Sequence, residues 1–445
     1  MKQLDAKLAI AIAILLLVAV IGWNWYDVKI FLNWVLAAKQ LSIVRIYEAY
    51  ELYGPQFRAV YPPLPILIFI ATDSFVDDLL SEISKACTYI SANIASILTS
   101  YAYRLLLKAP VVIPAALLAM ILARVYKRRE IAYWILLGVP TLVTIGTYQF
   151  DSLLALFLAL SLVALTRWGK PKLSAVFLAL ATLTKPIAAV FYLPIATYIG
   201  KRREALEYLA LFVAISLAFI APFALLEPRA FVENVLEFHM GRPPQYLSIW
   251  NVPVLLSMRS SAVVSVVDRV WILGYALAIA LVVALIKPKP RDELSLLSMV
   301  VAIGVVTTFV NKVVNPNYLM WVYPEVVVLA FVYGRALLNK LYNIYASVGI
   351  AWPAIYVTVP ALAGAPMYVE EVNHYISARH LLLESLSPPL NRTFETLFRT
   401  LDLSEIHSYT VALYHNLYIV GAAIILVYAL IGIYLIRELV RLRGA

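Results

Sequence analysis

Arg58 and Tyr61 lie just before Pro62-Pro63, where a new apolar segment begins. An arginine offers a planar set of N–H donors, and the backbone N–H groups at a helix start favour anions, so this arrangement is typical of phosphate binding. The alternative is an ordinary helix start, because proline suits the first helical turn. Asp27 stands at the other end of the same aromatic and charged stretch, where it is either a site residue or an interfacial carboxylate.

Lys185 lies between two short apolar segments and is followed by Pro186. An ammonium group at such a position must face a cavity or an anion, unless its chain reaches back to the membrane surface. Gln149 and Asp151 stand where one apolar segment ends and the next begins. We expect them either to line a site or, for Asp151, to begin a helix as a cap.

Two further polar groups occur later in the chain. Lys312 and Asn317 follow a long apolar segment, and they form either a polar turn or a second cationic contribution to the same site. His239 and Arg242 fall in a loop that could cover a substrate or simply be solvated. No two of the five histidines stand at the helical spacing of metal ligands, so the sequence does not support a divalent metal as a cofactor.

The composition is that of a membrane protein. Of the 445 residues 63% are hydrophobic and 14% are charged, with a mean hydropathy of +0.85, whereas soluble domains are roughly half apolar and a quarter charged. Apolar stretches long enough to span a bilayer recur along the chain, which predicts an all-α polytopic membrane protein. The sequence holds no phosphate-binding P-loop and no nucleophile elbow, so ATP-driven transport and hydrolase chemistry lack support.

We predict about twelve membrane-spanning helices from the apolar stretches. Their expected ranges are 8–25, 109–126, 131–149, 152–167, 173–184, 186–200, 206–226, 264–286, 294–311, 318–334, 343–364 and 412–436.

The placement of charge gives an orientation. With the N-terminus inside, the inner loops hold 20 of the 36 Lys and Arg but only 7 of the 26 Asp and Glu. This positive-inside pattern predicts cytoplasmic N- and C-termini in the cell (cytoplasmic) membrane. The same pattern explains the net charge of +10 without a nucleic-acid partner. It also predicts that the segments 26–108, 227–263 and 365–411 lie outside.

The region 63–108 allows two interpretations. The apolar part of 63–75 is too short to span upright, and 85–108 is only moderately apolar. We expect interfacial helices on the outer face rather than an extra pair of spans, because Asp73, Asp77, Asp78 and Glu82 would make a poor cytoplasmic turn.

Several of these pieces, in this order, resemble a known superfamily. A carboxylate follows the first span, and then come Tyr61-Pro62-Pro63-Leu64, Gln149-Phe150-Asp151, Leu183-Thr184-Lys185-Pro186 and the polar segment 311–321. This set resembles the GT-C superfamily of glycosyltransferases that use polyprenyl-phosphate sugars. The pieces at 149–151 and 311–321 are most similar to family 87-like mannosyltransferases and to the first mannosyltransferase of GPI-anchor synthesis.

The resemblance covers about residues 8–340, and we expect residues 1–340 to form the catalytic core, with the outer loops 26–108 and 227–263. Residues 341–445 would add C-terminal helices and the outer segment 365–411. One departure concerns the first loop, where the GPI enzyme has two acidic residues separated by one. Here Asp27 stands alone, followed by Val28 and Lys29. A second carboxylate could come from Glu48, Glu51 or Asp151.

The resemblance implies transfer of a hexose, mannose by analogy, from a dolichyl or other polyprenyl phosphate to a lipid or glycan acceptor at the outer face. Asp27 would be the general base, and Arg58, Lys185 and Lys312 would bind the donor phosphate. Tyr61, Gln149, Asp151, His239, Arg242 and Asn317 would line the site. A single displacement would invert the anomeric centre. The alternative is a transporter or flippase of a lipid-linked or small solute, which would use the same intramembrane charges.

Overall fold

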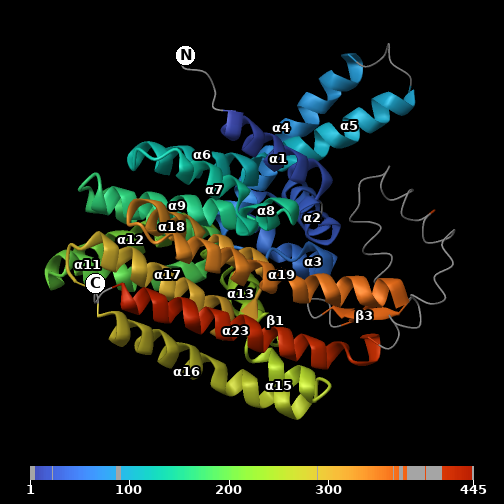
Figure 1. The fold of residues 1–445 in the computed structure, drawn as a ribbon. Helices are drawn as coiled ribbons and strands as arrows, with labels where there is room; N and C mark the ends of the chain where they lie inside the picture. Colours follow the sequence, from blue (N-terminus) through green and yellow to red (C-terminus); the bar gives the residue numbers. More distant parts are fainter. Residues whose placement is uncertain are drawn as a thin grey trace. The chain divides into compact units, whose positions relative to one another are not determined.

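The computed structural model describes residues 6–22, 24–86, 92–287, 289–363, 365–369, 374–377, 396 and 413–442. These residues are mostly helical, with two short strand pairs (Figure 1). Cys87 and most of the predicted outer segment 365–411 lie outside the described residues. The chain divides into two compact units. The first comprises Met1–Leu137, Thr141–Tyr192 and Lys201–Met240, and the second comprises Gly138–Pro140, Leu193–Gly200 and Gly241–Ala445.

The secondary-structure elements in the described part of the first unit are all helices. Its elements are α1 (Ala6–Ile21), α2 (Trp25–Leu41), η1 (Ile43–Glu48), α3 (Ala49–Tyr53), η2 (Pro55–Phe57), α4 (Pro63–Ala86), α5 (Ala92–Leu107), α6 (Ala109–Val125), α7 (Glu130–Leu137), most of α8 (Val139–Gly146), α9 (Asp151–Thr166), α10 (Pro171–Thr184), η4 (Pro186–Phe191), α12 (Arg202–Ala224), α13 (Pro228–Val232), the π-helical turn η5 (Glu233–Glu237) and most of α14 (Phe238–Gly241).

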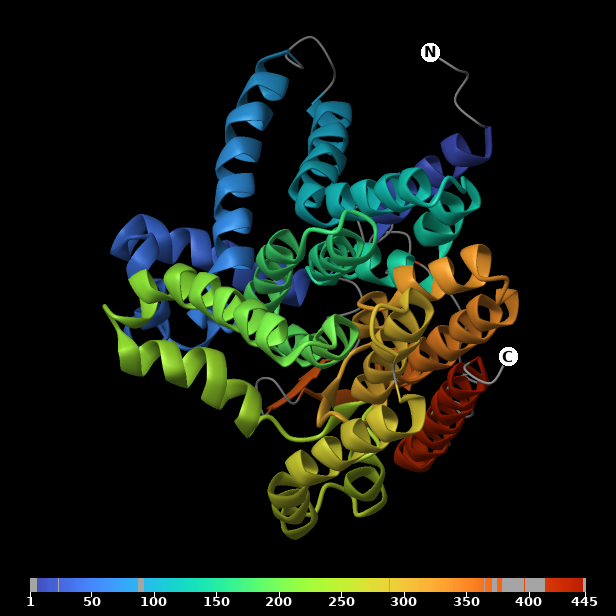
Figure 2. The same cartoon turned by 90° about the vertical axis from the view of Figure 1, so that its left-hand side faces the viewer.

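Helices α4 and α5 pack against each other as an antiparallel pair, drawn in blue to cyan (Figures 1 and 2). Helix α4 has 24 residues and continues beyond Phe75 to Ala86, so the apolar run 63–75 forms only its first part. Asp77 and Asp78 end the apolar run without ending the helix, since aspartate weakens a helix only slightly. Whether this pair lies at the interface stays a prediction.

The second unit is built around helices α17 and α23. Its elements are most of α11 (Tyr192–Ile199), β1 (Gln245–Tyr246), α15 (Asn251–Leu256), α16 (Ser261–Ile286), α17 (Glu293–Val310), β2 (Val313–Val314), η6 (Pro316–Met320), α18 (Tyr323–Val332), α19 (Ala336–Ala363), β3 (Pro366–Val369), β4 (His374–Ser377) and α23 (Leu417–Arg441). Strands β1 and β2 pair in parallel, with Gln245 opposite Val313, while β3 and β4 pair antiparallel.

The predicted third span, 131–149, is two helices rather than one. It breaks at Gly138 between α7 and α8. A Cβ atom at Gly138 would lie 2.1 Å from Cε1 of Tyr323, so only glycine allows this tyrosine ring to approach the backbone. Glycine at the break therefore leaves room for the Tyr323 ring.

Five described helices are long and apolar enough to cross a membrane, or six if the bent pair Ser100–Leu107 and Ala109–Val125 counts as one span. The five are α12, α16, α17, α19 and α23. In α12 and α16 only 17% of the apolar window is buried, whereas 83% is buried in α17. Apolar faces that stay exposed are suited to lipid, so these helices belong to an integral membrane protein.

Helical segments occupy all twelve predicted positions within the described part of the chain. Several are shorter than a full span, including α1, α9 and α10, so the number twelve stays a prediction.

Candidate functional site

Asp27 lies in the first turn of α2, at a half-buried position. Asn24 caps this helix: its side chain accepts a hydrogen bond from the Asp27 backbone N–H at 3.4 Å, and its Nδ2 donates to Asp27 Oδ2 at 2.5 Å. Asparagine is a favoured cap, and a carboxylate in the first turn is stabilised by the helix dipole. The local sequence therefore fixes the orientation of the Asp27 carboxylate.

Gln149 brings a second donor to the same carboxylate. Its Nε2 donates to Asp27 Oδ2 across 122 residues of sequence. Gln149 sits in the tight turn between α8 and α9, where Tyr148 adopts the left-handed region with φ of +56°. That conformation is uncommon for a residue with a large side chain, and it is held by the Tyr148 hydroxyl, which donates to the Leu107 carbonyl at 2.5 Å.

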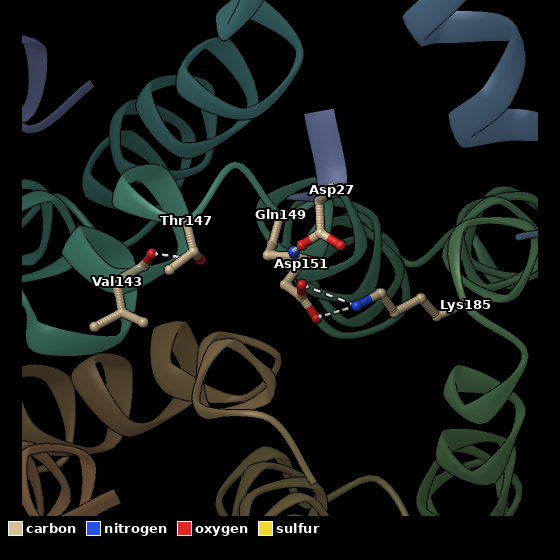
Figure 3. A network of polar contacts seen from close by, with 6 residues as sticks. All are labelled: Asp27, Val143, Thr147, Gln149, Asp151 and Lys185. Atoms are coloured by element: carbon tan, nitrogen blue, oxygen red, sulfur yellow. Dashed lines mark hydrogen bonds and ion pairs between the residues drawn. The ribbon is translucent and has the colours of Figure 1, made fainter. Parts of the chain in front are cut away.

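Asp151 and Lys185 form a buried ion pair beside this contact (Figure 3). Asp151 is the first residue of α9 and is fully buried, and Lys185 Nζ lies 2.9 Å from each of its carboxylate oxygens. Helix α10 ends at Thr184, because the residue before Pro186 cannot easily stay helical, and Lys185 is extended there. The sequence predicts that the Lys185 ammonium faces a cavity or an anion, and in the structure it faces the Asp151 carboxylate.

Tyr61 joins this group through its ring, whose centroid lies 5.6 Å from Lys185 Nζ. Its backbone carbonyl accepts a hydrogen bond from the Tyr47 hydroxyl at 2.8 Å. Tyr61 also belongs to a cluster of aromatic rings with centroids 4.6–6.3 Å apart, formed with Phe31, Trp34, Phe69, Tyr148 and Phe150. The packing of these rings restricts the movement of Tyr61 and of the turn that carries Gln149.

Arg58 holds the loop that ends at Tyr61. Its guanidinium lies 3.9 Å from the Tyr50 ring centroid and 4.9 Å from that of Phe238, and its Nε donates to Asn234 at 2.9 Å. His239 Nε2 lies 2.8 Å from the carbonyl oxygen of Val60. The helical segment around 234–239 therefore contacts the 58–61 loop within the first unit.

Asn234 was not singled out from the sequence, although it is central to this contact. It is fully buried in the π-helical turn η5 and donates to the Tyr47 and Ala230 carbonyls. Such turns often occur at functional sites. No sequence pattern marks a π-helical turn, so this residue could be found only in the structure.

The remaining predicted residues lie in the second unit. Lys312 is 1% exposed, and its Nζ lies 2.9 Å from Asp268 Oδ1 and 5.3 Å from the Trp271 ring centroid. Arg242 donates to the Gln245 side chain, next to the paired strands. Asn317 is buried in η6. Asp268 was not singled out from the sequence, although a carboxylate in an apolar helix is itself a signal of a functional site.

The first unit thus gathers Asp27, Tyr61, Gln149, Asp151 and Lys185, with Arg58 and His239 supporting the adjoining loop. That Lys312, Arg242 and Asn317 serve the same site stays a prediction. Among the described residues, no group of three or more His, Cys, Asp or Glu is arranged to hold a metal ion.

The two carboxylates differ in what they can do chemically. Asp151 has both oxygens committed to Lys185 in a fully buried position, which is suited to a structural role. Asp27 is half-buried and is oriented by two amide donors, which is suited to accepting a proton from a bound hydroxyl group. Of the two carboxylates, Asp27 is therefore the candidate for acid–base chemistry.

A comparison with protein families identifies the chain. No curated protein matches it, but residues 59–311 match the model of glycosyltransferase family 87. The match includes Tyr61, Gln149, Asp151 and Lys185, whereas Asp27 and Lys312 lie outside it, and it supports a glycosyltransferase of the GT-C type. With more than half of its length matched and with apolar helices suited to a bilayer, the chain belongs to glycosyltransferase family 87.

Proposed function

We propose that this membrane glycosyltransferase moves a hexose from a polyprenyl-phosphate donor to a lipid or glycan acceptor, with Asp27 as the general base. The observation that carries the proposal is the orientation of Asp27 by Asn24 and Gln149 at a half-buried position. Membership of family 87 and the apolar helices support a lipid-linked donor, because a lipid tail needs a groove or surface in the bilayer.

The proposed chemistry is a single displacement. The acceptor hydroxyl attacks the anomeric carbon of the donor, and Asp27 takes the hydroxyl proton as the new C–O bond forms. The bond from the anomeric carbon to the phosphate oxygen breaks, and the polyprenyl phosphate leaves with the bonding electrons. A hydroxyl group is a weak nucleophile with a high pKa, so a positioned base contributes on the order of 10²–10⁴-fold to such a step.

The leaving phosphate needs positive charge, because its own negative charge grows in the transition state. Lys185, Lys312 and Arg58 remain our candidates. Lys185 is the best supported of them, since its ammonium lies at the buried end of α10 near Tyr61 and next to the turn that carries Gln149. Its pairing with Asp151 means that it would act as part of a fixed ion pair rather than as an isolated cation.

The contacts of Arg58 support a different contribution. Its guanidinium lies over the rings of Tyr50 and Phe238, and it bonds to Asn234. These contacts hold the 58–61 loop, so we assign Arg58 first to positioning Tyr61 and only second to binding phosphate. A phosphate could still approach the remaining N–H groups of a guanidinium, which carries five donors.

Mannose is proposed as the sugar, and an active site on the outer face of the cytoplasmic membrane is proposed from the charge asymmetry of the loops. The test uses the purified protein in detergent with extracted membrane lipids as acceptors. It is offered lipid-phosphate mannose, lipid-phosphate glucose and a nucleotide-activated mannose in parallel. We expect transfer from the lipid-phosphate mannose, with a product whose anomeric configuration is opposite to that of the donor.

Two results would contradict the proposal. Transfer from the nucleotide sugar alone would refute a lipid-phosphate donor. A product that keeps the donor's anomeric configuration would refute the single displacement.

A further inference from the structure

Lys108 is a fully buried lysine that belongs to none of the sequence motifs described above. It lies between α5 and α6, where the helix direction changes by 54°. Taking an ammonium group out of water is costly unless it is well paired. The contacts of this side chain therefore point to a specific role.

The Lys108 ammonium donates to two backbone carbonyls. One is that of Gly22, directly after α1, and the other is that of Gly146, the last residue of α8, at 3.2 Å. Carbonyl groups at helix C-termini lack partners within their own helix and carry partial negative charge. Lys108 thus ties the ends of two helices together.

These two helix ends lead directly to the proposed site. Gly22 is five residues before Asp27, and Gly146 is three residues before Gln149. The chain segments that Lys108 joins are therefore the ones that carry the two hydrogen-bonded partners, Asp27 and Gln149.

The neighbours of Lys108 in the bend support the same turn. The Leu107 carbonyl accepts a hydrogen bond from the Tyr148 hydroxyl at 2.5 Å, and the Val111 carbonyl accepts one from Ser152 Oγ at 2.8 Å. Three successive contacts thus connect the bend between α5 and α6 to residues 146–152. The bend acts as a support for the turn that presents Gln149.

The two glycines allow the helix ends to come close enough for one ammonium to reach both. A Cβ atom on Gly22 would lie 2.7 Å from Gly146 Cα and 2.8 Å from the Gly146 carbonyl oxygen, both of them backbone atoms that cannot rotate away. A Cβ atom on Gly146 would meet only Val18 Cγ1, at 3.6 Å, which is an ordinary contact. The close approach therefore depends on glycine at position 22 and not at position 146.

We propose that Lys108 is a positioning residue, which clamps the ends of α1 and α8 so that Asp27 and Gln149 stay paired. The effect on catalysis rests on the proposed role of Asp27, whereas the effect on the distance between Asp27 and Gln149 does not. The two can therefore be measured separately.

The first experiment measures that distance. In a full-length chain whose only cysteine, Cys87, is replaced by serine, Asp27→Cys and Gln149→Cys are introduced together, and cross-linking by a short bifunctional thiol reagent is timed in detergent. Adding Lys108→Met is expected to slow this cross-link strongly. The control pair is Ser161→Cys with Ser174→Cys, whose hydroxyls are 2.9 Å apart between α9 and α10, and its cross-linking should not change.

Unchanged cross-linking of the 27–149 pair in Lys108→Met would overturn the proposal. Equal slowing of both pairs would overturn it too, because that result indicates general loosening of the unit rather than loss of a clamp.

The second experiment does not need Lys108→Met to fold. In the same cysteine background, Gly22→Ala is expected to slow the 27–149 cross-link, because the new methyl group pushes the two helix ends apart. Gly146→Ala is expected to slow it much less, because its methyl group has room. Equal effects of the two alanines would overturn the clamp.

The kinetic arm uses the wild-type residues at 27 and 149. A displacement of about 1 Å in a reacting group can cost on the order of 100-fold in rate. We therefore expect Lys108→Met and Gly22→Ala to lower kcat by that order while changing the KM for the donor little. A slowed cross-link with unchanged kcat would keep the clamp and refute Asp27 as the base, whereas an unchanged cross-link would refute the clamp whatever the rate.

Discussion

Replacing Asp151 by asparagine tests the buried ion pair at the centre of the site. The substitution keeps the size of the side chain but removes the charge that faces Lys185, whose side chain is only 8% exposed. Removing one partner of a buried pair leaves the other charge without compensation, and it typically costs about 3–5 kcal/mol. Each 1.4 kcal/mol is a factor of ten. The unfolding equilibrium should therefore shift by roughly 100- to 4000-fold.

The control for this variant is an exposed pair of the same kind. Arg203 Nε lies 3.0 Å from Glu207 Oε1, with side chains 92% and 65% exposed. Such pairs contribute about 0–1 kcal/mol, because water screens the charges. Glu207→Gln should therefore change the free energy of unfolding by no more than about 1 kcal/mol, measured by denaturant or thermal unfolding of the purified protein in detergent. Equal losses for Asp151→Asn and Glu207→Gln would refute the account of the buried pair.

The double variant separates stability from activity. Asp151→Asn combined with Lys185→Met removes both charges, and uncharged replacements of a buried pair are often neutral or stabilising. We expect stability to recover. If Lys185 also stabilises the donor phosphate, transfer should stay low in the double variant, whereas recovery of both stability and activity would contradict a role for Lys185 in phosphate binding.

Three further predictions concern the surrounding residues. Arg58→Lys should lower both transfer and stability, because an ammonium cannot lie flat over the Tyr50 ring while it also bonds to Asn234. Thermal unfolding and the KM for the donor, measured on the same variant, check this prediction. A variant indistinguishable from wild type would contradict it. The hydrogen bond from Arg45 lowers the pKa of Glu48 below its ordinary value of 4.5. Its stabilisation is therefore present above that value and is lost as the pH falls through the lowered pKa. Wild type and Glu48→Gln should thus differ in melting temperature at pH 7 and converge at acid pH, so a difference that grows on acidification would be contrary to this account. Chelation with EDTA should leave transfer largely intact, since the first loop supplies a single acidic residue at the position of the expected pair, and activity that needs added Mn²⁺ or Mg²⁺ would refute this expectation.

Much of the helical framework could be predicted from the sequence, because apolar runs report membrane helices directly. The helix before Lys185 ends where Lys185-Pro186 predicts. Asp151 begins α9 as predicted, but it is not the cap: the N-cap residue is Phe150, and the Asp151 carboxylate accepts hydrogen bonds from Lys185 instead. The length of α4 could not be obtained in this way. Charges at Asp77 and Asp78 end an apolar run, but they do not end a helix.

The side-chain contacts within the site could not be predicted from the sequence. Asp27 and Gln149 are 122 residues apart, and Asp151 and Lys185 are 34 apart, so no local pattern links them. Lys108 was missed for a different reason. The ammonium of a lysine next to an apolar segment usually reaches the membrane surface. Only the structure shows that the Lys108 side chain is buried and that its ammonium contacts the Gly146 carbonyl.

The most direct test of the central claim compares Asp27→Asn with the matched variant Asp78→Asn, whose carboxylate is exposed on α4. Transfer from lipid-phosphate sugar is measured under single-turnover conditions, and folding is checked by thermal unfolding. A general base is worth on the order of 10²–10⁴-fold, so Asp27→Asn should lose about that much activity while it stays folded. Asp78→Asn should keep wild-type activity. A folded Asp27→Asn variant with the wild-type rate would contradict the assignment of Asp27 as the base.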